Sequence, residues 1–170
     1  MRTGDNGGRA IAGSLSTVVG GCLLVGGVLL PWLDVTYALP GGTGTYIQSG
    51  WDRPEGKIAF FAGLVMAVAG VAMVCVATAR RIGALSAAVA TVVAVAVLGD
   101  WWSRLSSSGG GGYGVLVSSA GVLAGLAGVL LSFPGSRTQR LTLLACLFGT
   151  CLCGVVLALL VDQGPLFGTF

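Results

Sequence analysis

Histidine is absent from this chain of 170 residues. Without an imidazole, the protein cannot use histidine to bind zinc, to hold a haem iron or to act as a general base. The sequence also lacks a serine nucleophile beside a base, a phosphate-binding loop and paired carboxylates at helical spacing. It therefore predicts a protein that is not an enzyme, with no catalytic residue, cofactor or metal ion.

Charge is scarce as well. Only 9% of the residues are charged, against roughly 25% in soluble domains, and 55% are hydrophobic. The net charge of +3 comes from scattered bases that form no run. Nucleic-acid binding requires a basic stripe, so the composition excludes it and indicates the lipid bilayer as the protein's partner.

The chain contains several long apolar segments. Each is about 20 residues long, and a helix of that length matches the roughly 30 Å hydrocarbon core of a membrane. A lone strand would leave backbone groups unpaired in lipid. We expect an all-α membrane protein, a single bundle of five transmembrane helices over 11–161. The predicted spans are 11–30, 58–79, 82–102, 113–133 and 141–161.

The basic residues between the spans predict the orientation. The tail 1–10, the turn at Arg80–Arg81 and the loop 134–140 carry six of the nine Lys and Arg residues. Because the side richer in Lys and Arg stays in the cytoplasm, the N-terminus is predicted to be cytoplasmic and the protein to lie in the plasma membrane. The loop 31–57 and the tail 162–170 are then outside. If the segments before and after Arg80–Arg81 formed a re-entrant pair, the number of membrane crossings would change, and with it the predicted side of each later segment.

Cysteine offers two further interpretations. Residues 19–22 resemble a lipoprotein cleavage box, but the chain stays apolar through Leu33, which favours an uncleaved span. All five cysteines fall inside predicted spans and none forms a CxxC motif. They are expected to pack as small apolar residues rather than to bind a metal.

Small residues recur along the fourth span at alternating spacings of four and three. Lipid gives helices no hydrophobic reason to associate, so close packing of small residues has to do so. We expect a helix-packing seam, facing either a helix of this chain or a partner; the alternative is chance, because glycine and alanine are abundant. The seam is Gly114, Ser118, Gly121, Gly125 and Gly128. A similar stripe in the first span is Gly13, Thr17, Gly20 and Gly27.

Aromatic residues gather on the predicted outer side. All four tryptophans and all three tyrosines fall there, whereas an anchoring belt marks both interfaces. This one-sidedness predicts an outer aromatic face that binds a partner. Its members are Trp32, Trp51, Trp101, Trp102 and Tyr113.

The outer loop 31–57 has the pattern of a short β-hairpin. Val35, Tyr37 and Leu39 alternate with their neighbours, and residues 40–42, Pro-Gly-Gly, supply a turn. Because an isolated hairpin is marginal in water, we expect it to lie on the bundle or the tryptophans.

Five acids meet the same outer side and allow two readings. They form either a site for a divalent cation or interfacial ion pairs with nearby bases, and the sequence favours ion pairs. The acids are Asp34, Asp52, Glu55, Asp100 and Asp162, and the bases are Arg53, Lys57 and Arg104.

Three motifs resemble a group of small multi-pass membrane proteins of actinobacteria. They are LPWLDV at 30–35, GWDRPEGK at 50–57 and GGYGVLVSSAGVLAGLAGVLL at 111–131. The resemblance implies a four-helix pattern, to which the fifth span is an addition, the plasma membrane and no cofactor.

These observations favour a non-enzymatic accessory or scaffold subunit of a larger membrane complex, which packs on other membrane subunits or on copies of itself. An oligomeric transporter or channel component for a lipid or apolar solute is the alternative. Coupled transport is disfavoured because the helix centres are neutral. A third possibility, an enzyme acting on a lipid-linked substrate, requires Asp34, Asp52, Glu55 and Asp100 to converge.

Overall fold

Four long helices form the body of the molecule. The computed structural model describes residues 4–40, 42–76, 80–108 and 112–132. The helices are α1 (Gly4–Leu29), α2 (Pro54–Cys75), α3 (Arg80–Ser108) and α4 (Tyr113–Ser132). Each contains a stretch long and apolar enough to cross a membrane, as in a multi-pass membrane protein. The predicted fifth span, 141–161, lies outside the described residues.

Two helix boundaries differ from the sequence prediction. α1 begins at Gly4, inside the segment expected to be a tail, and α3 runs through Ser108, beyond the predicted end of the third span at 102. Serine costs a helix only a few tenths of a kcal/mol, whereas glycine costs about 1 kcal/mol relative to alanine. The serines at 106–108 are therefore compatible with the last turn of α3.

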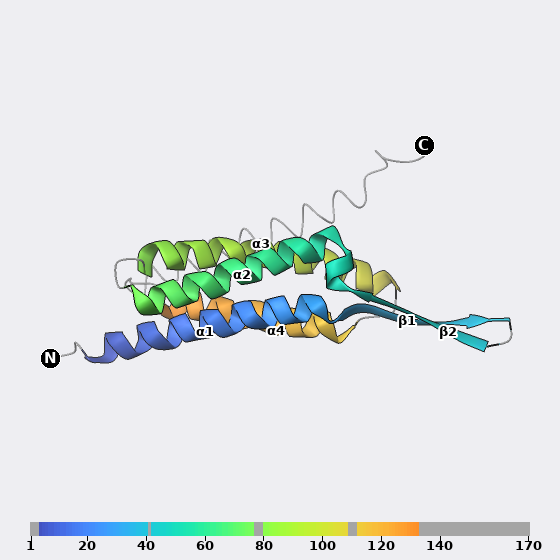
Figure 1. Ribbon diagram of the computed structural model, residues 1–170, viewed down its shortest axis with the longest axis horizontal. Helices are drawn as coiled ribbons and strands as arrows, with labels where there is room; N and C mark the ends of the chain where they lie inside the picture. Colours follow the sequence, from blue (N-terminus) through green and yellow to red (C-terminus); the bar gives the residue numbers. More distant parts are fainter. Residues whose placement is uncertain (1–3, 41, 77–79, 109–111, 133–170) are drawn as a thin grey trace, which may run out of the picture.

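The predicted hairpin is confirmed. Strands β1 (Pro31–Leu39) and β2 (Gly42–Ser49) pair antiparallel, with Val35 opposite Tyr46 and Tyr37 opposite Gly44. A short 3₁₀ helix at Gly50–Asp52 links β2 to α2. The hairpin does not lie on the bundle along its length: it projects beyond the ends of the helices as a two-stranded ribbon (Figure 1).

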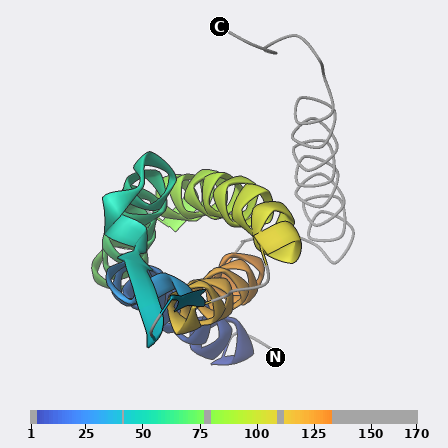
Figure 2. The same cartoon turned by 90° about the vertical axis from the view of Figure 1, so that its right-hand side faces the viewer.

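The helices bury two clusters of apolar side chains, a large one that includes Trp32 and Met66 and a small one around Val129. α1 packs most extensively on α4 and then on α2, α2 packs on α3, and the contact between α3 and α4 is smaller. Viewed along the helices, α1, α2 and α3 follow one another around the bundle and α4 lies beside α1 (Figure 2). The largest side chains that are completely buried include Trp32, Leu24 and Met66.

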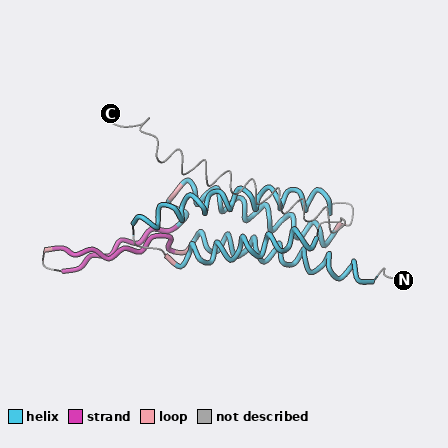
Figure 3. Tube along the Cα trace, turned by 180° about the vertical axis from the view of Figure 1, so that it is seen from behind, coloured by secondary structure: helices cyan, strands magenta, loops and turns pink. Residues whose placement is uncertain are grey.

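The alternating helix directions create two different ends (Figure 3). The hairpin, the start of α2, the end of α3 and the start of α4 lie at one end, which we call the hairpin end. The start of α1, the end of α2 and the start of α3 lie at the other end (Figure 3), which we call the arginine end because Arg80 and Arg81 begin α3 there.

Candidate functional site

The small residues of α4 lie against the backbone of α1. A Cβ atom placed on Gly20 would lie 2.5 Å from the nitrogen of Gly125 and 2.6 Å from the carbonyl oxygen of Gly121. Gly13 meets Ser132, and Gly27 meets Ser118, in the same way. Contacts thus repeat every seven residues in both helices, which run antiparallel.

This geometry decides which surface the α4 seam faces. It faces another helix of the same chain, so those five residues are not available to a partner. The hydroxyl of Ser16 adds a hydrogen bond across the interface, donated to the carbonyl oxygen of Ala124 at 2.8 Å. Backbones this close gain dispersion energy along the whole helix pair, which is the main source of helix association in lipid.

Trp32 joins the hairpin to the bundle. The pairing register slips between Pro31 and Leu33, so Trp32 has no partner on β2. Such a bulge redirects a side chain, and here the indole is fully buried. Its Nε1–H donates to the carbonyl oxygen of Gly27 at 3.0 Å, near the end of α1, where a helix leaves carbonyls unpaired.

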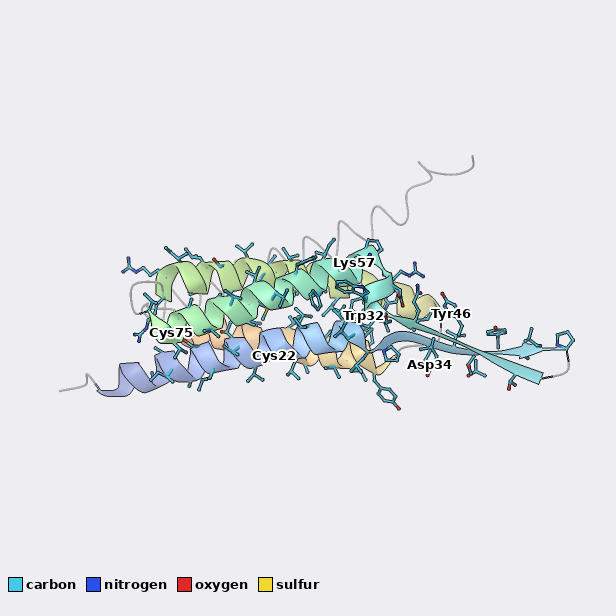
Figure 4. The ribbon with its side chains drawn as sticks, viewed as in Figure 1. Cys22, Trp32, Asp34, Tyr46, Lys57 and Cys75 are labelled. Atoms are coloured by element: carbon cyan, nitrogen blue, oxygen red, sulfur yellow. The ribbon has the colours of Figure 1, made fainter. Side chains whose placement is uncertain are left out.

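Two glycines provide the space for this indole. A Cβ on Gly50 would lie 2.5 Å from Cε2 of Trp32, and one on Gly114 would lie 2.7 Å from Cδ1. The backbone N–H of Gly112 donates to the carbonyl oxygen of Trp32 at 2.9 Å. Residues of α1, the 3₁₀ helix and α4 therefore contact the Trp32 side chain, which is labelled in Figure 4.

Trp101 is the second buried tryptophan. Its ring lies 5.3 Å from that of Trp32, tilted by 52°. The guanidinium carbon of Arg53 lies 5.7 Å from the Trp101 ring centroid, and Nε of Arg53 donates to Oε1 of Gln48 at 3.0 Å. Trp101 thus packs inside the bundle, below the base of the hairpin.

The predicted outer aromatic face is therefore not a single surface. Trp51, Trp102 and Tyr113 are exposed, whereas Trp32 and Trp101 are buried. Trp102 donates through Nε1 to the hydroxyl of Ser119 at 3.2 Å and so connects α3 to α4. The sequence places all five at one end, but the bulge at Trp32 and the packing of α3 direct two of them inward.

The hairpin has one apolar face that the sequence analysis did not single out as a site. Alternation puts the side chains that share a face two residues apart. One face is apolar apart from Gln48, Gly42 and Gly44, and it carries Leu33, Val35, Tyr37, Leu39 and Tyr46. The opposite face carries Asp34, Thr36, Ala38, Thr43, Thr45 and Ile47. Tyr37, Leu39 and Tyr46 are each about half exposed, at 46%, 52% and 48%.

The acids do not assemble into a site among the described residues. The carboxylate of Asp52 accepts hydrogen bonds from the backbone N–H of Ser49 at 3.0 Å and from its hydroxyl at 2.7 Å, which closes the turn after β2. Asp34 stands on the exposed hairpin, and Oε2 of Glu55 is buried without a hydrogen-bond partner in the described structure. No three acids or cysteines come within reach of one metal ion in the part of the chain that the structure describes.

The cysteines add no further cluster to the described residues. Cys22 and Cys75 lie on the exposed surfaces of α1 and α2 with free thiols (Figure 4). The other three, at 146, 151 and 153, fall outside the described residues.

A hollow lies between α2 and α3. Its volume is about 400 Å³, and it lies in the half of the bundle nearer the arginine end. A second hollow of about 350 Å³ shares Val65 with the first and continues toward the hairpin end. The lining of the first is Leu64, Val65, Val68, Ala69, Ala72, Ile82, Gly83 and Ser86.

Comparison with known proteins adds no relative: no family model, no curated protein and no solved structure matches the chain.

Proposed function

We propose that the protein is a non-enzymatic accessory subunit of a larger complex in the plasma membrane. In this proposal the N-terminus is cytoplasmic, and the hairpin stands outside the membrane, where it binds another subunit. The observation that carries the proposal is the hairpin that projects beyond the ends of the helices (Figure 1), because the outer part of its apolar face, at Tyr37, Leu39 and Tyr46, is about half exposed.

Two physical arguments support a partner at this face. A two-stranded ribbon is marginally stable in water unless a third element covers it. The base of this hairpin is held by Trp32, but Tyr37 and Leu39, farther along β1, remain about half exposed. The hairpin is fixed to the bundle at its base, so it loses little conformational entropy when its apolar face binds a partner. This favours association with a complementary surface.

Co-purification tests the proposal. The full chain is tagged, expressed in its native host and purified in mild detergent, and co-purifying membrane proteins are identified. A double variant, Tyr37→Thr with Leu39→Thr, keeps residues that favour strands but removes the apolar surface, so we expect a specific partner to be lost. The matched control, Thr36→Ser with Thr45→Ser, changes the opposite face and should retain the partner. A wild-type chain that purifies as a monomer with no partner would contradict the proposal.

The hollow between α2 and α3 favours a second candidate, the transporter or channel component for a lipid or apolar solute. A lateral groove is where such a solute enters from the bilayer. Transport of a fluorescent lipid between the leaflets of vesicles, with and without the protein, distinguishes this function from an accessory role.

A further inference from the structure

The outer part of the hairpin presents an ordered apolar surface. The ring of Tyr37 lies across Gly44 of the neighbouring strand, because a Cβ on Gly44 would lie 2.7 to 2.9 Å from three atoms of the phenol. Leu39 and Tyr46 stand on the same face and, like Tyr37, are about half exposed, whereas Val35, nearer the base, is half-buried. The surface that needs a cover is therefore the outer part of this face.

The direction of the helices brings the rest of the chain back to the hairpin end. α4 runs from Tyr113 at the hairpin end to Ser132 at the arginine end (Figure 3). The next predicted span, 141–161, contains no charged residue, and a span that begins at the arginine end finishes at the hairpin end. The tail 162–170 is thus expected on the hairpin's side of the membrane. Both segments lie outside the described residues, so this expectation comes from the sequence.

The tail 162–170 matches the hairpin in length and in chemistry. Nine extended residues reach roughly 30 Å, and β1 also has nine residues. Residues 166–170 read LFGTF, so strand alternation puts Leu166 and Phe170 on one side of an extended tail and Phe167 on the other. Large apolar side chains in a segment that faces water are more stable when another apolar surface covers them.

We propose that the tail 162–170 covers the apolar face of the hairpin within the same chain, with Leu166 and Phe170 packed on that face. A tail that leaves the membrane at the base of the hairpin reaches the level of Leu39 at Phe170. The span holds the tail beside the hairpin at an effective concentration on the order of millimolar, which favours this contact over one between two chains.

The contact bears on the accessory role because it covers the same face. A partner subunit would have to displace the tail, which would keep the apolar face covered until that subunit arrives. This regulatory consequence rests on the proposed function, whereas the contact itself does not.

Cross-linking within the full chain tests the contact. In a chain whose native cysteines are replaced by alanine, Gly168→Cys places a thiol on the Leu166 side of the tail. It is combined with Gly42→Cys on the apolar face, where an added Cβ meets no atom within 4 Å, or with Thr43→Cys on the opposite face. A short bismaleimide is added in detergent. Cyanogen bromide then cleaves the chain after Met66, so the hairpin and the tail stay together only if they are cross-linked.

We expect the Gly42→Cys pair to cross-link within a monomer about tenfold more than the Thr43→Cys pair. Leu166→Ser with Phe170→Ser removes the apolar side of the tail and should abolish this preference. Phe167→Ser is the matched control, because it changes the other side of the tail and should keep the preference. All variants share one background, so a folding defect of that background would affect them alike.

Three results would overturn the proposal. Equal cross-linking of the two pairs would show that the tail prefers neither face. A cross-linked dimer in place of a cross-linked monomer would show that a second copy covers the hairpin. No cross-link in either pair would place the tail elsewhere, at the membrane surface or on another subunit. None of these results depends on whether a partner co-purifies, so the tail contact and the accessory role fail separately.

Discussion

At the scale of single residues, Trp32 connects the parts of the molecule. It is the first large aromatic after α1, and its indole touches the 3₁₀ helix, α4 and Trp101 while it bonds to α1. A tryptophan at a membrane interface ordinarily anchors to lipid headgroups. This one instead fixes the direction in which the hairpin leaves the bundle, because the chain enters β1 directly from the end of α1.

Replacement of Trp32 by phenylalanine should therefore destabilise the fold. Trp32→Phe removes the hydrogen bond to Gly27 and part of the buried ring, so we expect a loss of about 1–3 kcal/mol. Thermal unfolding in detergent, followed by circular dichroism, measures it. Trp51→Phe is the matched control, because Trp51 is 40% exposed and meets Phe60 only at a ring edge. Equal losses in the two variants would show that Trp32 has no special role.

At the scale of elements, the antiparallel pair of α1 and α4 makes the most extensive helix contact in the described structure. The glycine contacts recur every seven residues, as in a left-handed helix pair. The pair leaves small hydroxyls buried within it, including the hydroxyl of Ser118, which has no hydrogen-bond partner in the described structure. A serine hydroxyl beside a glycine Cα fits the Cα–H···O contacts common at close helix crossings.

Two glycines of α1 allow a matched test of this packing. Gly20→Ala should push α1 away from α4 and cost about 1–3 kcal/mol, since its Cβ would meet backbone atoms of Gly125 and Gly121. Gly26→Ala meets no atom within 4 Å and should be neutral or stabilising by about 0.5–1 kcal/mol, because alanine favours the helix. The midpoint of thermal unfolding in detergent compares them. A Gly20→Ala protein as stable as Gly26→Ala would contradict the close approach.

At the scale of the whole molecule, the two ends of the helix bundle carry different residues. One bears the hairpin, the tryptophans and the exposed Tyr113, and the other bears Arg80, Arg81 and the start of α1. The orientation predicted from the sequence places the arginine end in the cytoplasm, because lysine and arginine are retained on the cytoplasmic side.

Cysteine labelling tests that orientation. In a chain whose native cysteines are replaced by alanine, Thr43→Cys introduces a thiol near the hairpin tip and Gly8→Cys introduces one near the start of α1. Neither change removes a charge, and Gly8 has no atom within 4 Å of an added Cβ. With the N-terminus in the cytoplasm, a membrane-impermeant maleimide should label Thr43→Cys in intact cells and Gly8→Cys only after lysis. The reverse pattern would show the opposite orientation.

The local pattern of the chain was enough to place the four described spans and the hairpin. The length of an apolar segment and the alternation of apolar and polar residues in a strand depend only on residues close in the sequence. Both can therefore be recognised without knowledge of the tertiary structure. The stripe at Gly121 and Gly125 was visible for the same reason, because helical spacing alone puts those residues on one face.

The tertiary structure decided what those faces meet. Spacing could not show that the stripe on α4 lies against Gly20 of α1, because the choice of partner depends on how the four helices pack together. The spacing of residues also could not show that a bulge turns Trp32 inward. Nor could it show that the hairpin projects beyond the helices instead of packing along the bundle. The hollow between α2 and α3 arises in the same way: alanines on two helices leave space only when those helices become neighbours.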